Sequence, residues 1–359
     1  MIFFNKALTE GTIYHSLNNN IIEFYSTNPL TPIKSELLIG GIDYITIYPN
    51  ANGLFWLNVK DYVNAQIQSN KFQDDLDIQP FSNSNYLFDW TSKIFLQLPI
   101  TIKTIFEDLS FETATLNPKF LSSYTNEKTS LSESEDIILL NKNNKYKYWV
   151  GYPFEIDFYK RADVFTLIKN DLTNDITTPS KIVRLFFSDG ILNTELQAYF
   201  PKFRINEKEV FIDVIEPQCY NNKIYIKYLN SLGGWNYYLF NNYNEQLTTK
   251  DLGELFNDYN NVEDTVSKTL QVGKTSISTL EVTTDAIEYE EALLLRDLLD
   301  SPKVYLFTGQ PNTASNYNDW VEVAINNNSY SLYNSKLNKT IYNFKIELPT
   351  NTTRTLWDI

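Results

Sequence analysis

The stretch from Tyr220 to Phe240, with the sequence YNNKIYIKYLNSLGGWNYYLF, constrains the fold of this chain more than any other. Between Lys223 and Tyr228 the residues alternate with the period of a half-buried strand. Gly233 and Gly234 follow, and glycine tolerates the positive φ that a tight turn requires. The alternation restarts at Trp235. The stretch therefore predicts a β-hairpin whose turn contains both glycines, with Trp235 largely buried.

The rest of the chain repeats this pattern of short alternating segments separated by turn residues. Its 359 residues exceed one ordinary hydrophobic core, so we expect two or three domains. The 25 Tyr and 23 Phe residues belong to types that strands favour. The sequence therefore predicts a mainly β fold of two or three β-sandwich-like modules with a few short helices. The strands are predicted at 21–25, 37–39, 44–48, 55–57, 93–105, 137–140, 146–150, 155–159, 164–168, 182–187, 194–199, 275–283, 304–307, 320–325 and 341–348.

One helix is predicted in the C-terminal part, from Asp285 to Asp300. Asp285 followed three residues later by Glu288 is typical of a helix N-terminus, where acids offset the positive end of the dipole. A Ser-Pro pair directly after Asp300 ends the helix. Ile287, Leu294 and Leu298 share one face of this helix, and Leu295 and Leu299 widen it. We therefore expect that face to pack on the C-terminal sheet.

Three weaker local patterns complete the secondary structure. Asn58 can cap a helix on which Val59, Tyr62, Val63 and Ile67 form an apolar stripe. The polar run at 141–144 between two short strands predicts a hairpin. Residues 252–256, in a polar, Asn-rich region, are a candidate helical turn.

Composition shifts divide the chain into three segments. Residues 1–80 read as an N-terminal β-sandwich-like module, which could extend to residue 160. Residues 81–205 form a middle β-rich region, and residues 206–359 form a C-terminal β-rich module with the helix at 285–300.

Charge and composition exclude several classes of function. The net charge of −14 disfavours binding to nucleic acid, because phosphate backbones repel an acidic surface. One cysteine rules out a disulfide within the chain and fits folding in a reducing cytoplasm. No apolar run is long enough to predict a membrane span. The sequence indicates no cofactor.

Motifs that carry chemistry are weak in this sequence. Gly273-Lys274-Thr275 lacks the earlier glycine of a phosphate-binding loop, since that position is Lys268, so a turn before a strand is the better interpretation. His15 and Cys219 are the only histidine and the only cysteine. They could form a catalytic pair only if folding brought them together. We therefore predict no catalytic, cofactor-binding or metal-binding residues.

Acidic residues leave one catalytic alternative open. The cluster at Asp74–Asp77 lacks the spacing of a calcium loop, and the cluster at Glu288–Glu291 begins a helix, where acids offset the positive end of the dipole. With 44 acids in the chain, a pair of carboxylates placed for glycoside hydrolysis is still possible, because only distances decide that chemistry. Aromatic residues at strand spacing are more often core or subunit interface than a platform that stacks on sugars.

Several motifs of the C-terminal third form one pattern. It is a strand that ends in Leu-Asn, then Gly-Gly-Trp with an aromatic pair, a helix that ends before Ser-Pro, and a Trp-x-x-Val strand. These features stand at 228–240, 298–302, 304–306, 320–323 and 343–348. In this pattern the C-terminal third resembles structural proteins of the tail and baseplate of bacteriophages that infect Bacteroidota. The first sixth is loosely similar at 25–57, and the middle is not covered.

The resemblance implies a virion component that is made in the cytoplasm of the bacterial host. We therefore expect a non-enzymatic structural protein that binds other virion proteins and copies of itself, for example in a ring. One alternative is a receptor-binding or glycan-binding decoration of the tail or head, with host surface glycan as its ligand. A second alternative is a carboxylate-dependent virion enzyme that degrades glycans.

Overall fold

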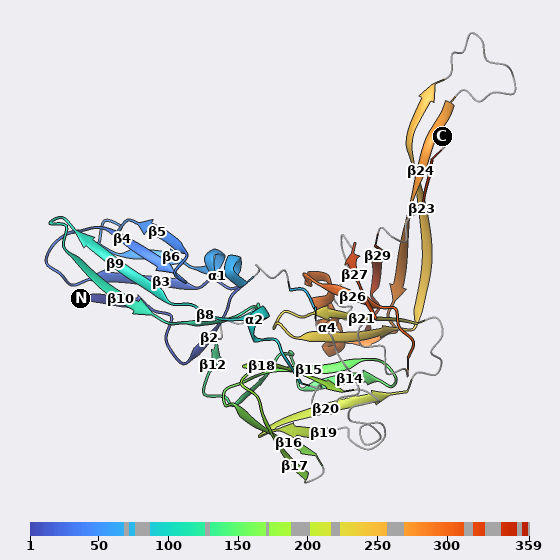
Figure 1. Cartoon of the computed structure of the whole chain (residues 1–359), viewed down its shortest axis with the longest axis horizontal. Helices are drawn as coiled ribbons and strands as arrows, with labels where there is room; N and C mark the ends of the chain where they lie inside the picture. The colour runs from blue at the N-terminus through green and yellow to red at the C-terminus, as the bar shows by residue number, and fades with distance from the viewer. Residues whose placement is uncertain are drawn as a thin grey trace. The chain divides into compact units, whose positions relative to one another are not determined.

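The structure is a computed structural model that describes residues 1–67, 72–75, 87–125, 130–169, 172–187, 202–216, 223–256, 269–311, 319–326, 339–349 and 354–357. Over these residues the chain is mainly β with a few short helices, as predicted (Figure 1). Its internal contacts define two compact units. Unit 1 contains residues 1–215 and the short segment Asn230–Trp235, and unit 2 contains the rest. The three segments predicted from composition are a finer division, and they stay a prediction.

The N-terminal part of unit 1 is a sandwich-like pair of antiparallel sheets. One sheet has the order β1-β3-β6, with β1 at Ile2–Lys6, β3 at Ile21–Ser26 and β6 at Phe55–Asn58. The other has the order β10-β9-β4-β5, with β10 at Phe111–Leu116, β9 at Ile100–Phe106, β4 at Pro32–Ile39 and β5 at Asp43–Ile47. Alternate residues of these strands are buried, which is the basis of the period-two pattern. The buried rings of Phe24 and Phe55 stack with centroids 5.0 Å apart.

Helix α1, Lys60–Ile67, follows this sandwich directly, as the sequence predicted. The side-chain Oδ1 of Asn58 accepts a hydrogen bond from the backbone N–H of Lys60 at 3.2 Å, which satisfies one donor at the start of the helix. Val63 and Ile67 are buried on its inner face.

Three further sheets complete unit 1. The first has the order β12-β2-β11-β8, the second β13-β15-β18-β7 and the third β14-β20-β19-β16-β17. A short helix, α2, precedes β8. The bounds are β2 Thr12–His15, β7 Leu87–Asp89, α2 Thr91–Ile94, β8 Phe95–Gln97, β11 Lys119–Leu121, β12 Leu131–Ser132, β13 Ile137–Leu139, β14 Lys145–Trp149, β15 Phe154–Lys160, β16 Val164–Lys169, β17 Leu172–Thr177, β18 Ile182–Phe187, β19 Lys202–Ile205 and β20 Lys208–Ile215.

Two local predictions in this region are wrong. The polar run at 141–144 does not join a hairpin, because β13 pairs with β15 whereas β14 pairs in parallel with β20. The loosely alternating strand predicted at 93–105, in which Pro99 indicated an edge or a bend, is divided: Pro99 separates β8 from β9, and the first residues belong to α2. In both cases the local pattern identified the strands, and long-range contacts chose their partners. The strand predicted at 194–199 lies outside the described residues.

Unit 2 is built on one large sheet with the order β22-β21-β26-β27-β29-β24-β23, and β30 also pairs with β24. The strands β25 and β28 pair with each other, and both contact helix α4. The bounds are β21 Ile224–Leu229, β22 Trp235–Phe240, β23 Asn242–Phe256, β24 Thr269–Thr283, β25 Ile287–Glu288, α4 Tyr289–Asp300, β26 Val304–Phe307, β27 Trp320–Ile325, β28 Lys339–Thr340, β29 Asn343–Glu347 and β30 Arg354–Trp357.

Helix α4 packs on this sheet and ends at Asp300, as predicted, but it begins later than expected. Its N-cap residue is Glu288, so Asp285 does not cap it, and the preceding residues form β25. Leu298 is completely buried, whereas Leu294 is only half-buried. The hydroxyl of Tyr228 on β21 donates a hydrogen bond to the backbone carbonyl of Leu294 at 3.1 Å, which ties the helix to the sheet.

The strands β23 and β24 form a hairpin that the sequence pattern did not predict. Both are 15 residues long, and they run antiparallel from Asn242 opposite Thr283 to Phe256 opposite Thr269. The helical turn predicted at 252–256 is therefore wrong, because these residues end β23. Figure 1 shows the hairpin as a long ribbon that leaves the other strands of unit 2.

Candidate assembly surfaces

The turn between β21 and β22 contains the two glycines that the sequence singled out. The backbone N–H of Gly233 donates to the carbonyl of Asn230 at 3.1 Å, and the N–H of Asn230 donates to the carbonyl of Gly234 at 2.8 Å. The Asn230 side-chain oxygen accepts from the N–H groups of Leu232 and Gly234. Its amide group donates to the carbonyl of Leu140 at 2.8 Å. The turn is therefore held within unit 1 by backbone and side-chain bonds.

The two glycines are required for different reasons. Gly233 has φ of +87°, a left-handed conformation that disfavours every residue with a Cβ. Gly234 does not adopt this conformation. A Cβ on Gly234 would lie 2.4 Å from the carbonyl oxygen of Leu140, a backbone atom that cannot rotate away.

We expect Gly234→Ala to destabilise unit 1 by about 1–3 kcal/mol, because the added methyl group overpacks a rigid contact. The fluorescence of the adjacent Trp235 should shift as the turn moves. Gly53→Ala isolates the other effect, since Gly53 has open space where its Cβ would be but a φ of +73°, so its cost reports backbone strain without overpacking. Urea unfolding followed by tryptophan fluorescence measures both variants. A Gly234→Ala protein with unchanged stability and spectrum would contradict the close contact with Leu140.

Trp235 is buried against a second tryptophan and an arginine. It is 2% exposed, and its ring centroid lies 6.1 Å from that of Trp90. The guanidinium carbon of Arg184 lies 4.7 Å from the Trp90 ring and 5.5 Å from the Trp235 ring. The backbone N–H of Trp235 donates to Asp157 Oδ2 at 2.5 Å. Trp235 is therefore held on a buried charged cluster of unit 1.

That cluster contains one cation and three carboxylates. Arg184 on β18 is fully buried and makes two bidentate ion pairs. Its Nη atoms lie 2.7 and 3.0 Å from the Asp74 carboxylate, and its Nε and Nη2 lie 2.8 and 2.7 Å from Glu155. Asp157, the third carboxylate, has its Oδ1 atom 3.9 Å from Arg184 Nε. Two-point contacts of this kind are among the strongest ion pairs in proteins.

Burial explains the electrostatics of the cluster. Removal from water raises the pKa of Asp157 well above its usual value, and the nearby charge of Glu155 raises it further. Asp157 Oδ1 accepts no hydrogen bond from any residue that the structure describes, which fits a protonated carboxyl group. Glu155 and Asp157 stand two residues apart on β15, and both are buried. They present no surface to a sugar, so this acid pair is a structural element.

We expect Asp157→Asn to change the pH dependence of stability. Because burial raises the pKa of Asp157, the native state keeps a proton that the unfolded chain has lost, so this group lowers stability as pH rises above about 4. The asparagine carries no such penalty. Denaturation midpoints at about pH 4 and about pH 8 should show the variant gaining stability over the wild type at the higher pH. Asp136→Asn, at an exposed ion pair, is the surface control. An equal difference at both pH values would exclude a buried protonated Asp157.

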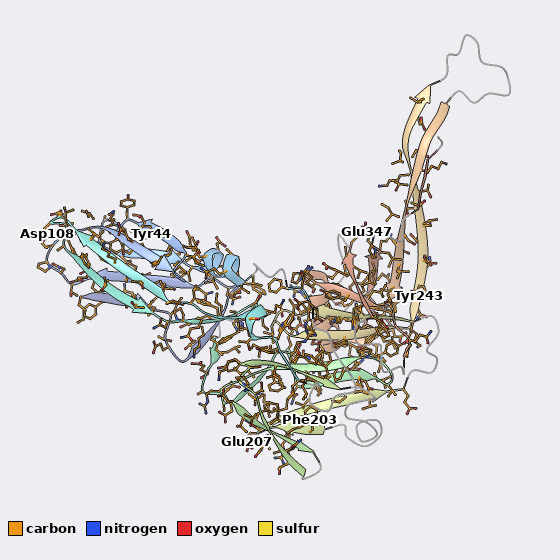
Figure 2. All side chains as sticks on the ribbon, viewed as in Figure 1. Tyr44, Asp108, Phe203, Glu207, Tyr243 and Glu347 are labelled. Atoms are coloured by element: carbon orange, nitrogen blue, oxygen red, sulfur yellow. The ribbon has the colours of Figure 1, made fainter. Side chains whose placement is uncertain are left out.

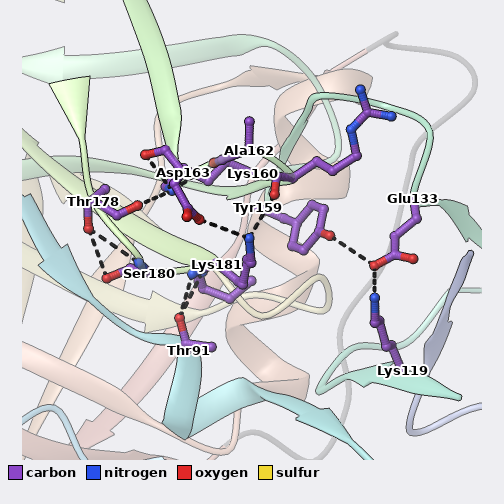
Figure 3. A network of polar contacts seen from close by, with 12 residues as sticks. Thr91, Lys119, Glu133, Tyr159, Lys160, Ala162, Asp163, Thr178, Ser180 and Lys181 are labelled. Atoms are coloured by element: carbon purple, nitrogen blue, oxygen red, sulfur yellow. Dashed lines mark hydrogen bonds and ion pairs between the residues drawn. The ribbon is translucent and has the colours of Figure 1, made fainter. Parts of the chain in front are cut away.

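Figure 3 shows a second polar network around Lys160, at the end of β15. The Lys160 side chain is buried, and burial lowers the pKa of its amine. Its Nζ donates to the carbonyl oxygens of Ala162 at 2.9 Å, Asp163 at 3.2 Å and Thr178 at 2.5 Å. An ammonium group has three hydrogens, and all three are used here. Lys160 therefore closes a loop and is not available as a nucleophile.

The same network continues through Tyr159 to the neighbouring sheet of unit 1. The Tyr159 hydroxyl donates to Glu133, which also pairs with Lys119 of β11 (Figure 3). Burial, with the charge of Glu133, raises the pKa of Tyr159 to about 12. Tyr159 therefore stays neutral and acts as a hydrogen-bond donor.

His15 forms a buried hydrogen-bonded pair with Ser123. Its Nδ1 is 2.6 Å from Ser123 Oγ, and both side chains are buried. Because Ser123 Oγ donates to the carbonyl of Leu121 at 3.1 Å, the geometry assigns the proton to His15 Nδ1. A protonated Nδ1 cannot act as a base toward this serine. Cys219, the other half of the pair considered from the sequence, lies outside the described residues.

The Gly-Lys-Thr motif and the described acids of the two acidic clusters lie in strands, ion pairs or a helix start. Gly273-Lys274-Thr275 lies inside β24 and forms no phosphate-binding loop, and it is not the turn that we expected. Asp74 belongs to the Arg184 cluster, Asp75 pairs with Lys93 at 3.0 Å, and Asp77 lies outside the described residues. The acids at 288–291 stand at the start of α4. Within the described ranges, no group of His, Cys, Asp or Glu side chains is placed to hold a metal ion.

Two outer sheet faces of the N-terminal sandwich expose aromatic side chains. On the β1-β3-β6 sheet, Phe3 stacks on Tyr25 across the strands, and Trp56 lies opposite Glu23. Trp56 is 54% exposed. The amide of Asn5 donates to Glu23 at 3.0 Å on the same face. This face combines flat aromatic rings with polar groups.

The outer face of the β10-β9-β4-β5 sheet has a similar composition with more charge. Tyr44 on β5 is 63% exposed (Figure 2). Glu36 lies between two lysines, with its carboxylate 2.7 Å from Lys34 Nζ and 3.7 Å from Lys103 Nζ. Lys103 Nζ also lies 4.8 Å from the centre of the exposed Phe111 ring. Tyr44 and Phe111 are therefore large side chains that this face exposes.

The β23–β24 ribbon is the most exposed element of unit 2. β23 is the last strand of its sheet, so one of its edges faces no described strand. Leu247 is 61% exposed and Leu255 is 58% exposed. Tyr243, near the base of the ribbon, is also exposed (Figure 2). β29 and β30 pair with β24 over 279–283 and 273–276, so the ribbon has a third strand on that side, and the edge that faces no described strand is that of β23.

Sequence reasoning missed both Arg184 and β23, although each left a signal. Arg184 stands alone in the apolar strand IVRLFF, and a charge in such a strand is buried only when it is paired. The sequence of β23, NYNEQLTTKDLGELF, contains β-branched residues but no sustained alternation. A strand with both faces in water lacks the pattern on which the prediction depended.

No model of a known protein family matches this chain, and no curated protein sequence matches it. Across the part of the chain that the structure describes, no helix has the length and apolar character needed to cross a membrane. Function is therefore argued from the surfaces described above.

Proposed function

We propose that this protein is a non-enzymatic structural component of a bacteriophage virion, in the tail or baseplate region. It acts through interfaces with other virion proteins and with copies of itself. The observation that carries the proposal is the β23–β24 ribbon, which exposes leucines and an open strand edge. The similarity of the C-terminal third to tail and baseplate proteins of phages of Bacteroidota supports the same role.

Several features support assembly over catalysis. Long, exposed edge strands are a hazard that proteins normally avoid, and they persist where another chain covers them. Exposed aromatic residues, which dominate the energetics of interfaces, are present on two faces of the N-terminal sandwich. The buried groups with reactive chemistry, such as Lys160 and His15, are engaged in structural hydrogen bonds.

The test is to locate the protein in particles of a phage that encodes it. An antibody or gold label on the chain should mark a ring or layer at the tail or baseplate in electron micrographs. A variant in which a two-residue turn replaces residues 247–278 should fold but fail to enter particles. Particles that contain no copy of the protein would refute the proposal.

A second candidate function is binding of host surface glycan by the aromatic faces of the N-terminal sandwich. Trp56 and the stacked pair Phe3 and Tyr25 offer flat rings beside the Glu23 carboxylate, a combination that suits a sugar. Incubation of the purified protein with host polysaccharide distinguishes the alternatives. Binding lost in Trp56→Ala favours a glycan-binding decoration. Release of oligosaccharides that stops when one acid is neutralised favours an enzyme.

A further inference from the structure

We propose that the open edge of β23 pairs with β23 of a second copy of this chain, antiparallel and centred on Leu247. This inference rests on the proposed assembly role and names the partner of the β23–β24 ribbon. The register of the ribbon, the exposure of its side chains and the charges along its edge support this pairing.

The open edge of β23 presents backbone N–H and C=O groups. In an antiparallel ladder, each strand directs the N–H and C=O groups of alternate residues to one neighbour and those of the other residues away from it. β23 pairs only with β24 among the described strands, so every second residue presents its backbone groups to the open edge. A row of such groups at the spacing of a strand is complementary to another extended strand. The chemistry of the edge therefore selects a polypeptide.

The regular part of β23 limits how many residues a second strand can pair with. The ladder between β23 and β24 is regular from Asn242 to Asp251, and its register shifts between Asp251 and Gly253 and again before Glu254. A bulge of this kind bends a strand and ends regular pairing. A second strand can therefore pair with 242–251, and Leu247 lies near the middle of this regular stretch.

Leu247 is exposed to solvent in the middle of this regular stretch. Leu247 lies opposite Ser278 of β24, and Leu280 and Val282 follow on the same face. Those two side chains are buried in the core of unit 2, whereas Leu247 is 61% exposed. Leu247 is therefore an apolar side chain that this face leaves exposed, beside Glu245, whose carboxylate accepts a hydrogen bond from Ser278 Oγ.

The side chains along 242–251 favour one register of the pair. A two-fold axis that relates identical antiparallel strands places one residue opposite itself. With Leu247 at the centre, the two exposed leucines meet, and no like charges face each other along 242–251. The opposed residues are Gln246 with Thr248, Glu245 with Thr249, Asn244 with Lys250, and Tyr243 with Asp251.

The neighbouring registers are less favourable. Centring the pair on Thr248 places Glu245 opposite Asp251 twice, and directly opposed like charges destabilise a sheet. Centring it on Gln246 places the exposed Leu247 opposite the Glu245 carboxylate. The Leu247 register alone among these three joins apolar to apolar without repulsion, which is why a second copy is a fitting occupant.

Cysteine cross-linking tests the register in the full-length protein. In a Cys219→Ser background, which removes the only native cysteine, Leu247→Cys should form a disulfide-linked dimer under mild oxidation. The paired Cα atoms then lie within the range of about 4.4–6.8 Å that a disulfide needs. Tyr243→Cys is the matched control, since its own counterpart lies about 27 Å away along the strand. Adding Asp251→Cys to Tyr243→Cys should restore the cross-link.

A second measurement does not depend on cysteine chemistry. Leu247→Glu should weaken self-association about tenfold or more in sedimentation velocity, because two buried leucines are lost and two carboxylates meet. Leu252→Glu, on an exposed leucine beyond the regular ladder, should leave self-association unchanged. A monomeric wild-type protein, or a cross-link at Tyr243→Cys as strong as at Leu247→Cys, would overturn the inference.

These outcomes are separate from the fate of the proposed function. If the chain enters phage particles but Leu247→Cys forms no dimer there or in solution, the self-pairing inference fails and the assembly role stands. If Leu247→Cys dimerises but particles lack the chain, the pairing stands and the virion role fails.

Discussion

Replacing Arg184 with methionine is expected to destabilise unit 1 by about 3–5 kcal/mol, because it leaves the buried carboxylates of Asp74 and Glu155 without their cation. Methionine fills part of the same volume, so the loss reports charge more than packing. The Trp90 and Trp235 rings contact the guanidinium, and their fluorescence should change in the same variant. Urea unfolding followed by tryptophan emission measures both effects.

The matched control is Arg161→Met. Arg161 also pairs with an aspartate, Asp136, but both side chains are about half exposed. Exposed ion pairs contribute about 0–1 kcal/mol, so this variant should unfold close to the wild type. If Arg184→Met and Arg161→Met had equal effects, the Arg184 cluster would not be buried as described.

Leu298→Ala is expected to destabilise unit 2 by about 2–5 kcal/mol, the range for a fully buried leucine that leaves a cavity. Leu298 lies on the face of α4 that packs toward the sheet, together with Leu295 and Ala292. Loss of this packing should detach the helix from β21, where Tyr228 holds its backbone. Thermal unfolding monitored by circular dichroism checks the size of the effect.

Leu294→Ala separates the structure from the simpler sequence prediction. The sequence placed Leu294 and Leu298 on one face that Leu295 and Leu299 widen, whereas the structure buries Leu295 and Leu298 and leaves Leu294 half-buried. Leu295→Ala should therefore resemble Leu298→Ala, and Leu294→Ala should cost clearly less. Equal losses at Leu294 and Leu298 would restore the predicted face and require a different orientation of α4.

Local patterns predicted the elements whose two sides differ. Strands such as β9 alternate because one face meets the core, and that alternation can be read without knowing the partner strand. The Ser-Pro pair after Asp300 ends α4 as expected, since a proline and its preceding residue both disfavour helix. The glycines at 233 and 234 indicated a turn, although only the structure shows that one serves a left-handed φ and the other a close contact.

Partners far apart in the sequence decided the rest. Asp74, Glu155 and Arg184 come from distant segments, and nothing local indicates that they meet in one buried cluster. β13 and β14 are neighbours in the chain but belong to different sheets, because each finds its partner elsewhere.

The sequence by itself therefore determined the mainly β class and most strands of the cores, because a strand buried on one face alternates apolar and polar residues. It also determined the end of α4, because the Ser-Pro pair after Asp300 cannot continue a helix. The tertiary structure alone decided strand partners, the Arg184 cluster and the β23–β24 ribbon. Pairing and ion-pair geometry depend on contacts across long stretches of chain. A strand exposed on both faces, such as β23, carries no periodic signal at all.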